Sequence, residues 1–304
     1  MLWIEALHFG QYVADIVMKS LLKSVHQRYL LEPWLTCVSN WRVRGVSDRE
    51  PIFVYQMGKV GSNQVCGLLE TCPSLGSEVY HIHTLNPATL ENYIARQRSS
   101  PRPALAIDQI ESRALIRATR QRMPSCRVIT LVREPISRAI SLVFEAWKKY
   151  APDAMEEPGK LNPDKMLEAV SRQLAKPGGV ADPSAWFESE LNAVLGVDVF
   201  RCPLGETGYS IISEPYPTLV IRLEDLDSVA VDALEEFLGI RPTGMIGQAN
   251  SGATKWYGEA YQEVKRRLRL PESTLDRICG TRYFSHFYSD RVDAVRRAWG
   301  EEVK

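Results

Sequence analysis

The sequence predicts an α/β fold in which helices cover both faces of a mostly parallel sheet. Short apolar runs suited to buried strands alternate with longer amphipathic stretches suited to helices, as in sequential β-α-β units. One run, residues 127–132, is almost continuously apolar, which is typical of a strand buried in the middle of a parallel sheet. The 304 residues are 45% hydrophobic, which is enough for one large domain.

The first 50 residues are expected to form an amphipathic helix and a connection. Apolar residues recur at helical spacing through 1–31, but polar residues interrupt them, so the stretch suits neither a transmembrane span nor a secretory signal. Packing on the rest of the protein is favoured, and peripheral contact with a membrane surface is the alternative. Residues 33–50 are expected to be a polar connection, so that residues 51–304 form the main domain.

The main domain is expected to alternate strands and helices from its first residues. Up to residue 150, strands are predicted at 52–56, 78–84 and 127–132, and helices at 62–71, 87–98, 104–122 and 135–150. The start of segment 104–122 also suits a short strand. A stretch rich in proline and glycine, 151–184, is expected to be a mobile excursion around one helix at 164–175, within an insertion near 145–195. The remaining predictions are strands at 197–200 and 218–222, and helices at 184–195, 226–238, 256–268, 272–279 and 281–299.

The turn after the first predicted strand has the composition of a phosphate-binding loop. Gly58-Lys59-Val60-Gly61-Ser62-Asn63 brings two glycines, a lysine and a hydroxyl to the start of a helix. Free N–H groups of a first helical turn point at a bound anion, and the helix dipole adds roughly half a positive charge. Because Lys59 directly follows Gly58, the turn is shorter than G-x-x-x-x-G-K-[ST] and should hold fewer phosphates than a nucleoside triphosphate offers. An ordinary strand-to-helix turn is the alternative.

A second candidate anion site opens the helix that follows strand 127–132. Arg133 lies at the end of the strand, and Ser137 and Ser141 are four residues apart, so they share one helix face. A guanidinium group and hydroxyls at a helix start suit a phosphate monoester. Glu134 and Arg138 are interpreted as a charge pair on the helix surface.

The carboxyl ends of parallel strands meet at one edge of a sheet, and ligands bind beyond that edge. The loop around Lys59, His83 and Arg133 all follow predicted strands, so we expect them to lie close together.

Composition argues against two classes of binding site. The 37 basic and 37 acidic residues balance, with a pI near 7.0, so no nucleic-acid partner is expected. The six cysteines are scattered and form neither a C-x-x-C pair nor a Cys/His cluster, so no metal site is predicted. Reduced thiols in a cytoplasmic protein are the default expectation.

The two anion motifs together resemble the sulfotransferases that use 3′-phosphoadenosine 5′-phosphosulfate (PAPS). In that family a P-K-x-G-[ST]-[ST]-like loop holds the 5′-phosphosulfate end, and a later R-x-P-x-x-x-x-x-S stretch holds the 3′-phosphate. Lys59 to Ser62 match the first motif, and Arg133, Pro135 and Ser141 match the second at the same spacing. Asn63 stands where the family often has a second hydroxyl. The resemblance implies a P-loop-like three-layer sandwich (the sulfotransferase fold), PAPS as co-substrate, and transfer without a metal.

A closer resemblance is to a bacterial subgroup associated with capsular polysaccharide synthesis. Its members carry Y-Q-M-G-K-V-G-S, H-x-H, L-V-R-E-P-I, W-F-x-x-E, G-[IV]-D-V and a late N-K-W-Y. The matching residues here are Tyr55 to Ser62, His81-Ile82-His83, Leu131 to Ile136, Trp186 to Glu190, Gly196 to Val199 and Lys255-Trp256-Tyr257. Four residues separate Asn250 from Lys255, so the last motif is stretched and the role of Asn250 stays open.

The resemblance also suggests roles for two later segments. It implies that the loop carrying Lys255 and Trp256 folds over the nucleotide, where the indole suits either stacking on adenine or anchoring of the following helix. Arg222-Leu223-Glu224-Asp225-Leu226 is similar to an R-x-E-D-L stretch of the family. We expect a structural role for it, with Glu224 or Asp225 capping the next helix.

Sulfuryl transfer needs a group that stabilises charge on the leaving phosphate and a base for the acceptor hydroxyl. Lys59 with the loop N–H groups suits the first role. Imidazole suits the second near neutral pH, and two of the five histidines, His81 and His83, lie on one face of a predicted strand. His83, nearer the carboxyl end, is expected to be the base, and His81 to orient it or the substrate. A structural role for both is the alternative, with Asp108 or Glu111 as base if the chain there is a strand.

The sequence therefore favours a cytoplasmic carbohydrate sulfotransferase, with peripheral membrane contact through residues 1–31 as the alternative to their packing on the protein. The acceptor groove is expected along 151–184, with Trp147 and Trp186 offering aromatic faces to sugar rings. A P-loop-type kinase of a small molecule or nucleotide is the nearest alternative, but it would need a magnesium-binding acid where the chain has Arg133-Glu134. A non-catalytic member of a polysaccharide assembly system is the third candidate.

Overall fold

The structure is a computed structural model whose described residues form two compact units. One unit contains the described residues up to Glu50 together with those of Ile82–Ser125, and the other contains Pro51–His81 and the chain from Cys126 onward. The described residues are 31–48, 50–72, 75–99, 105–120, 123–204, 207–244 and 252–301. Within these ranges, no helix combines the length and the apolar character needed to cross a membrane. The helix expected over 1–31 lies outside the described residues except for its last position, and Asn250 lies outside them too.

The first unit is helical. It contains α2 (Glu32–Arg42), α4 (Pro87–Arg98) and α5 (Ile107–Ala118), and both α2 and α4 pack against α5. The expectation that 33–50 is only a polar connection is wrong, because proline in the first turn starts a helix there. A strand around Asp108 and Glu111 is also excluded, since both lie on α5.

The second unit contains a five-stranded sheet in the order β2-β1-β3-β7-β6. β1 pairs with β3 and β3 pairs with β7, both in parallel, and β6 runs antiparallel to β7 at the edge. The strands are β1 (Ile52–Tyr55), β2 (Val79–Ile82), β3 (Arg127–Val132), β6 (Tyr209–Ile212) and β7 (Thr218–Arg222). The prediction of a mostly parallel sheet with 127–132 at its centre is therefore confirmed, and β6 is an additional strand.

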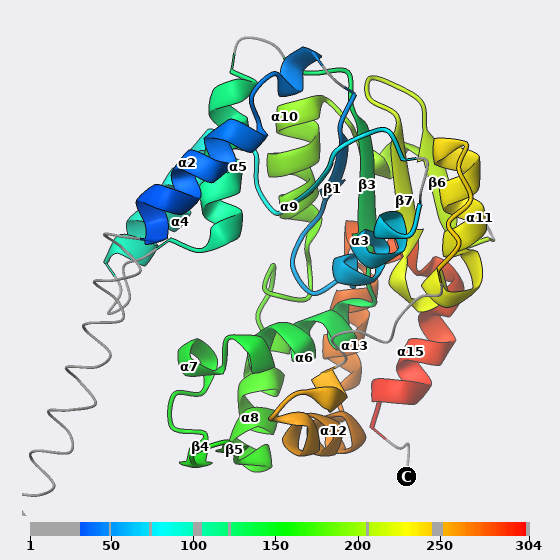
Figure 1. Ribbon diagram of the computed structural model, residues 1–304. Coiled ribbons are helices and arrows are strands. Elements are labelled where there is room, and N and C mark those ends of the chain that lie inside the picture. Colours follow the sequence, from blue (N-terminus) through cyan, green and yellow to red (C-terminus); the bar gives the residue numbers. More distant parts are fainter. Residues whose placement is uncertain are drawn as a thin grey trace, which may run out of the picture. The chain divides into compact units, whose positions relative to one another are not determined.

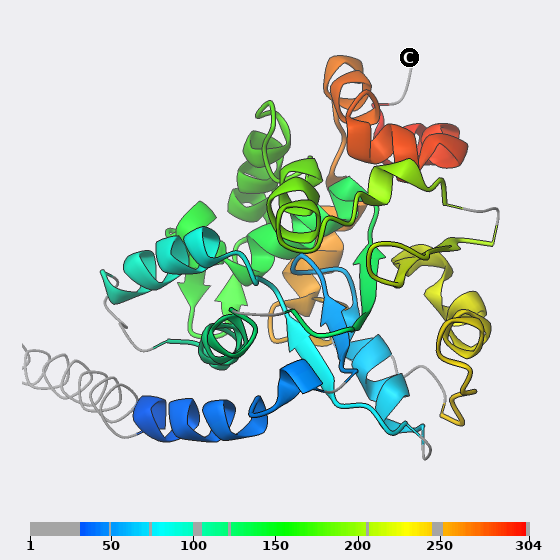
Figure 2. The same ribbon diagram turned by 90° about the horizontal axis from the view of Figure 1, so that it is seen from above.

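Helices lie on both sides of this sheet. Figures 1 and 2 show α3 and α11 on one side and the segment of α9 and α10 on the other. The helices are α3 (Ser62–Glu70), α6 (Pro135–Glu145), α7 (Trp147–Tyr150), α8 (Pro163–Leu174), α9 (Ser184–Phe187), α10 (Ala193–Leu195), α11 (Leu226–Leu238), α12 (Gly258–Arg267), α13 (Glu272–Cys279), α14 (Arg282–Phe287) and α15 (Val292–Trp299). A π-helical turn, Glu188–Asn192, joins α9 to α10.

Three local predictions need correction. The strand expected at 197–200 is a 3₁₀ turn, Val199–Arg201, because the Asp198 side chain accepts a hydrogen bond from the N–H of Phe200 at 3.0 Å. The helix expected at 281–299 is two helices, since the backbone leaves the helical region at Tyr288. Ala146 separates α6 from α7 within the helix expected at 135–150.

The segment predicted as an excursion around one helix contains that helix, α8, and a short hairpin in addition. The hairpin pairs β4 (Met155–Glu157) with β5 (Lys160–Leu161) in an antiparallel arrangement. Gly159 has a φ of 90° in the connecting turn, a conformation that glycine adopts without steric cost.

Candidate functional site

The turn between β1 and α3 adopts a backbone shape that most residues avoid. Gly61 has a φ of 84°, and a Cβ at this position would lie 2.4 Å from Leu223 Cδ1, so only glycine fits here. Lys59 also has a positive φ, 73°, which is uncommon for a residue with a side chain. Strained backbone of this kind persists where the surroundings hold it in place, and it clusters at functional sites. We call residues 58–63 the cradle.

Two arginines at the start of α6 hold the carbonyl groups of the cradle. Arg133 Nη1 donates to the Lys59 carbonyl at 3.0 Å, and Arg138 Nε donates to the Gly58 carbonyl at 3.2 Å. In a trans peptide the C=O and the following N–H point in opposite directions. The N–H groups of Lys59 and Val60 are therefore directed away from the arginines, and α3 adds the N–H groups of its first turn. Successive N–H groups arranged in this way form a concave anion-binding surface.

Glu134 and Arg138 do not form the surface charge pair expected from the sequence, because both side chains are buried. The carboxylate of Glu134 accepts from the N–H groups of Ile136 at 2.7 Å and Ser137 at 2.8 Å, and so caps α6. Burial raises the pKa of Glu134 even though these hydrogen bonds oppose the rise. Arg138 also donates to the carbonyl of Val180 at 3.0 Å.

The other end of α6 carries an acidic residue that contacts both lysines of the predicted site. Glu145 Oε2 lies 3.0 Å from Lys59 Nζ and 2.6 Å from Lys255 Nζ, and it accepts a hydrogen bond from the Tyr257 hydroxyl at 3.1 Å. We call Lys59, Glu145, Lys255 and Tyr257 the lysine cluster. Glu145 is a site residue that the sequence analysis did not select. Glu145 lies four residues after Ser141 and therefore on the same helix face, and this spacing is the sequence signal that could have identified it.

Contacts and burial within the lysine cluster shift the pKa values of its members. Burial alone would raise the pKa of Glu145, but hydrogen bonds and charges from Lys255 and Lys59 lower it to about 2. The pKa of Lys59 is lowered, chiefly by burial and further by the charges of Lys255 and Arg133, while Glu145 acts in the opposite direction. The pKa of Lys255 is raised, since burial, which lowers it, is outweighed by Glu145 and Tyr257 together. Glu145 therefore stays ionised at neutral pH.

The candidate bases fall in different units. Gln56 Nε2 donates to Ser62 Oγ at 2.8 Å and lies 3.0 Å from His81 Nε2, so His81 is linked to the cradle through one amide. β2 ends at Ile82, so His81 lies in the strand and His83 directly follows it, whereas both were expected within one strand. His83 belongs to the helical unit, and its role as base stays a prediction.

The stretch Trp186 to Glu190, which carries part of the resemblance, packs behind β1. Tyr55 donates a hydrogen bond to Glu190, which is fully buried, and the ring of Tyr55 meets that of Trp186 edge to face at 5.4 Å. Trp186 also packs against Phe187. These contacts pack the stretch against β1.

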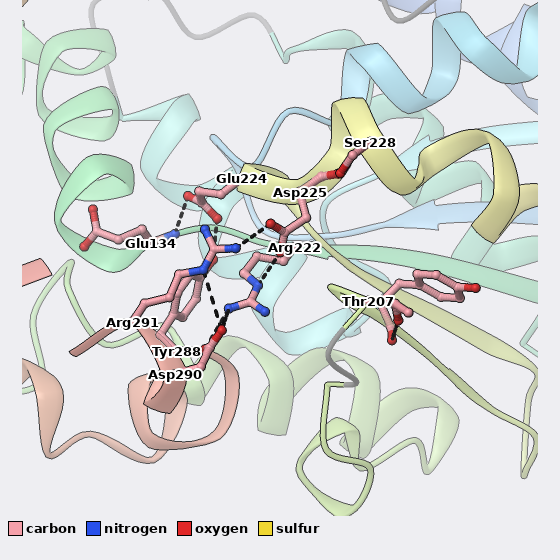
Figure 3. A network of polar contacts seen from close by, with 10 residues as sticks. Glu134, Thr207, Arg222, Glu224, Asp225, Ser228, Tyr288, Asp290 and Arg291 are labelled. Atoms are coloured by element: carbon pink, nitrogen blue, oxygen red, sulfur yellow. Dashed lines mark hydrogen bonds and ion pairs between the residues drawn. The ribbon is translucent and has the colours of Figure 1, made fainter. Parts of the chain in front are cut away.

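The segment after β7 forms a charged network (Figure 3). Arg222 Nη1 donates to both carboxylate oxygens of Asp290 at 2.8 and 2.9 Å. Its Nε lies 2.7 Å from Asp225 Oδ2, as an ion pair that is not aligned as a hydrogen bond. Arg291 also pairs with Asp225. We call Arg222, Glu224, Asp225, Asp290 and Arg291 the arginine network.

The arginine network joins elements of the fold, but its acids do not cap α11 as expected. Asp225 stands at the N-cap position without a side-chain hydrogen bond to the helix. Glu224 Oε1 accepts from the backbone N–H of Glu134 at 2.9 Å, and Glu224 Oε2 accepts from the Tyr288 hydroxyl at 2.8 Å. The network thus ties the end of β7 to the start of α6.

A cleft of about 630 Å³ lies beside the lysine cluster. The β4–β5 hairpin and α12 line it, and Tyr257 belongs to both the cleft and the cluster. Trp256, which is 52% exposed, forms part of the wall, and the ring of Trp147 meets it edge to face at 6.4 Å. Trp186 does not line this cleft, so the aromatic wall consists of Trp256 and Tyr257 instead of the expected tryptophan pair. Polar lining residues include Lys160, Glu259, Glu263 and Arg266.

Comparison with known proteins gives one match. Residues 170–289 match the model of the NKWYS family, which is described as a putative capsular polysaccharide synthesis protein. The matched segment covers less than half of the chain, includes Lys255-Trp256-Tyr257 and most of the arginine network, and excludes the cradle and Arg133. No curated protein and no solved structure matches the chain significantly.

Proposed function

We propose that this protein transfers a sulfuryl group from PAPS to a hydroxyl group of a carbohydrate during synthesis of a capsular or exported polysaccharide. The observation that carries the proposal is the 3.0 Å hydrogen bond from Arg133 to the carbonyl of Lys59. It joins the arginine of the predicted 3′-phosphate motif to the lysine of the predicted 5′-phosphosulfate loop. The two anion motifs lie 74 residues apart in the sequence and adjoin in the fold.

The side chains around this contact suit a donor that carries anionic groups at two ends. The cradle N–H groups and the Lys59 ammonium would hold the 5′ end. A guanidinium group has five N–H donors, and one of those of Arg133 is used on Lys59, so others remain for a phosphate. Ser141 lies on the α6 face that ends at Glu145 and offers a hydroxyl, whereas the Ser137 hydroxyl already bonds to Glu134.

In the proposed reaction the acceptor hydroxyl oxygen forms a bond to sulfur as the bond from sulfur to the donor phosphate oxygen breaks. Adenosine 3′,5′-bisphosphate leaves, and the hydroxyl proton passes to a base. Lys59 would stabilise the negative charge that develops on the leaving phosphate. His83 is the proposed base, and His81, held through Gln56, would orient the groups around the cradle.

The cleft beside the lysine cluster is the proposed acceptor site. Sugar rings present apolar faces that pack on an indole ring and hydroxyls that hydrogen-bond to charged side chains, and the cleft offers Trp256 together with Lys160, Glu259 and Arg266. The description of the matching family also supports a polysaccharide context.

The burial of Glu134 counts against a kinase that uses the same cradle. A magnesium-binding acid would be needed at the end of the central strand, and Glu134 is the acid there. Both of its carboxylate oxygens are engaged by N–H groups of α6.

Nucleotide binding to the pure protein tests the proposal. By calorimetry, adenosine 3′,5′-bisphosphate should bind more tightly than ATP and more tightly than AMP, which lacks the 3′-phosphate. Ser141→Ala should weaken the bisphosphate roughly ten-fold, the effect of losing a hydrogen bond to a charged group, and leave AMP unchanged. Ser171→Ala on α8 is the control. Equal affinities for the bisphosphate and AMP, or tighter binding of ATP, would overturn the proposal.

A further inference from the structure

The lysine cluster has the geometry of an anion site that is filled by a residue of the chain itself. One oxygen atom, Glu145 Oε2, is contacted by two ammonium groups and a phenol hydroxyl, at 3.0, 2.6 and 3.1 Å. The three donors come from segments distant in sequence, the cradle and the segment before α12. Donors that converge on one oxygen in this way present the surroundings that a phosphate or sulfate oxygen requires.

We propose that Glu145 occupies the position of a donor anion and competes with it, so that binding of PAPS displaces the carboxylate from Lys59 and Lys255. This inference rests on the proposed function for the identity of the anion. It adds a specificity-determining residue to that function, because an incoming group must outcompete a carboxylate that is already held by two lysines. A phosphate or phosphosulfate group has enough charge and oxygens to engage both ammonium groups, whereas chloride has a single charge and no directional acceptor pair.

Three features allow Glu145 to leave its position. It is the last residue of α6, where the negative end of the helix dipole disfavours a carboxylate. Its side chain is 45% exposed, so it can turn into water without desolvation. Lys59, in contrast, is 26% exposed, so its ammonium group has less access to water than the carboxylate has.

A different role for Glu145 makes the opposite prediction. If the carboxylate served to hold the two lysines in place for the donor, its removal would scatter them and weaken anion binding. If it competes, its removal frees both lysines and takes a negative charge away from the incoming anion. The sign of the change in affinity therefore decides between the two roles.

The experiment measures the binding of adenosine 3′,5′-bisphosphate and of inorganic pyrophosphate to the full chain by calorimetry at low, fixed ionic strength. Glu145→Gln should bind both probes about ten-fold more tightly than the wild type, which is close to the effect of one negative charge removed at contact range in a site well screened by water. Glu145→Asp keeps the charge on a shorter side chain and should fall between the wild type and Glu145→Gln. Glu91→Gln, the same substitution at an exposed position of α4, should change nothing.

The two probes separate this inference from the proposed function. Tighter pyrophosphate binding by Glu145→Gln supports the competition even if the wild type does not prefer the bisphosphate, in which case only the proposed function fails. Unchanged or weaker binding of both probes by a folded Glu145→Gln variant overturns the competition, even if the wild type prefers the bisphosphate. Thermal unfolding of each variant verifies that it is folded, and Glu145→Ala replaces Glu145→Gln if the latter is not.

Discussion

The lysine cluster and the arginine network both lie at the carboxyl edge of the same sheet, and they differ in how their charges are balanced. In the arginine network, two arginines face three acids, Glu224, Asp225 and Asp290. In the lysine cluster, two lysines share one carboxylate, and Arg133 lies next to Lys59. The first group has one more acid than it has arginines, and the second has positive charge in excess. Only the lysine cluster, of these two groups, has the excess positive charge that attracts an anionic ligand.

The arginine network and the lysine cluster also differ in how far their side chains are buried. The Arg222 side chain is 4% exposed, and its guanidinium group also lies over the ring of Tyr288 at 5.5 Å. The lysine cluster is accessible to solvent, as the exposure of Glu145 shows. Buried ion pairs are costly to break, whereas accessible ones contribute little to stability and can exchange partners. The comparison therefore indicates a stabilising role for the arginine network and supports the proposed ligand binding at the lysine cluster.

Breaking the arginine network should have the largest effect on the fold. Arg222→Met leaves Asp225 paired with Arg291 alone and removes both hydrogen bonds to Asp290, and removing one partner of a buried pair costs about 3–5 kcal/mol of unfolding free energy. Urea unfolding would measure the loss. Arg241→Met is the matched control, because Arg241 also contacts two carboxylates, those of Asp232 and Glu235, but on the exposed surface. Equal losses of unfolding free energy in the two variants would contradict the stabilising role of the arginine network.

Removing the cradle lysine should reverse that pattern, with a large effect on activity and a small one on stability. Lys59→Ala should lower sulfuryl transfer from PAPS about 10²–10³-fold, the usual effect of losing one group that stabilises transition-state charge. Lys59→Gly should lose as much activity and unfold at a higher temperature than Lys59→Ala, because glycine relieves the backbone strain at a φ of 73°.

Lys165→Ala is the control for this prediction, since Lys165 is an exposed lysine in an ion pair with Asp153 at 3.2 Å. It should retain full transfer activity. Activity of Lys59→Ala within a few-fold of the wild type would remove Lys59 from the proposed chemistry and leave the cradle with a binding role only.

The parts of the site that the sequence predicted are those set by local patterns. The glycines around Lys59 and the apolar runs before the cradle and Arg133 fix two strand ends. Parallel pairing of β1 with β3 then brings those ends together. The contact between Arg133 and the cradle follows from this topology, so the sequence pattern alone predicts that the two lie close together.

The parts that the sequence did not predict depend on distances between segments far apart in the chain. Glu145 joins the site only because Lys59 and Lys255 both reach the end of α6. Glu134 and Arg138 have the spacing of a surface pair, and their burial depends on neighbours such as Val180 that the helix pattern does not reveal. The edge strand β6 was missed for a related reason, since its half-buried residues lack the apolar run of a central strand.

The smallest predicted effect concerns the stability that Glu145 itself contributes. Its folded-state pKa, about 2, lies below the ordinary carboxyl value of 4.5, so the ionised form is favoured in the fold. A depressed carboxyl pKa gives stability that is fully present above the unfolded-state value and is lost as the pH falls through the folded-state value. The contribution of Glu145 should therefore be constant near neutral pH and disappear between about pH 5 and pH 2. Solvent screening at this half-exposed site limits it to about 1 kcal/mol or less.

The difference in unfolding free energy between the wild type and Glu145→Gln isolates this contribution, because all other carboxyl groups titrate in both proteins. Measured without added anions, the difference should favour the wild type at pH 6 and shrink to zero as the pH approaches 2. Added pyrophosphate at pH 6 should also shrink it, since the anion replaces the lost carboxylate at Lys59 and Lys255. A difference that does not vary with pH or pyrophosphate would mean that Glu145 acts through packing, and the charge comparison between the two regions would lose its support.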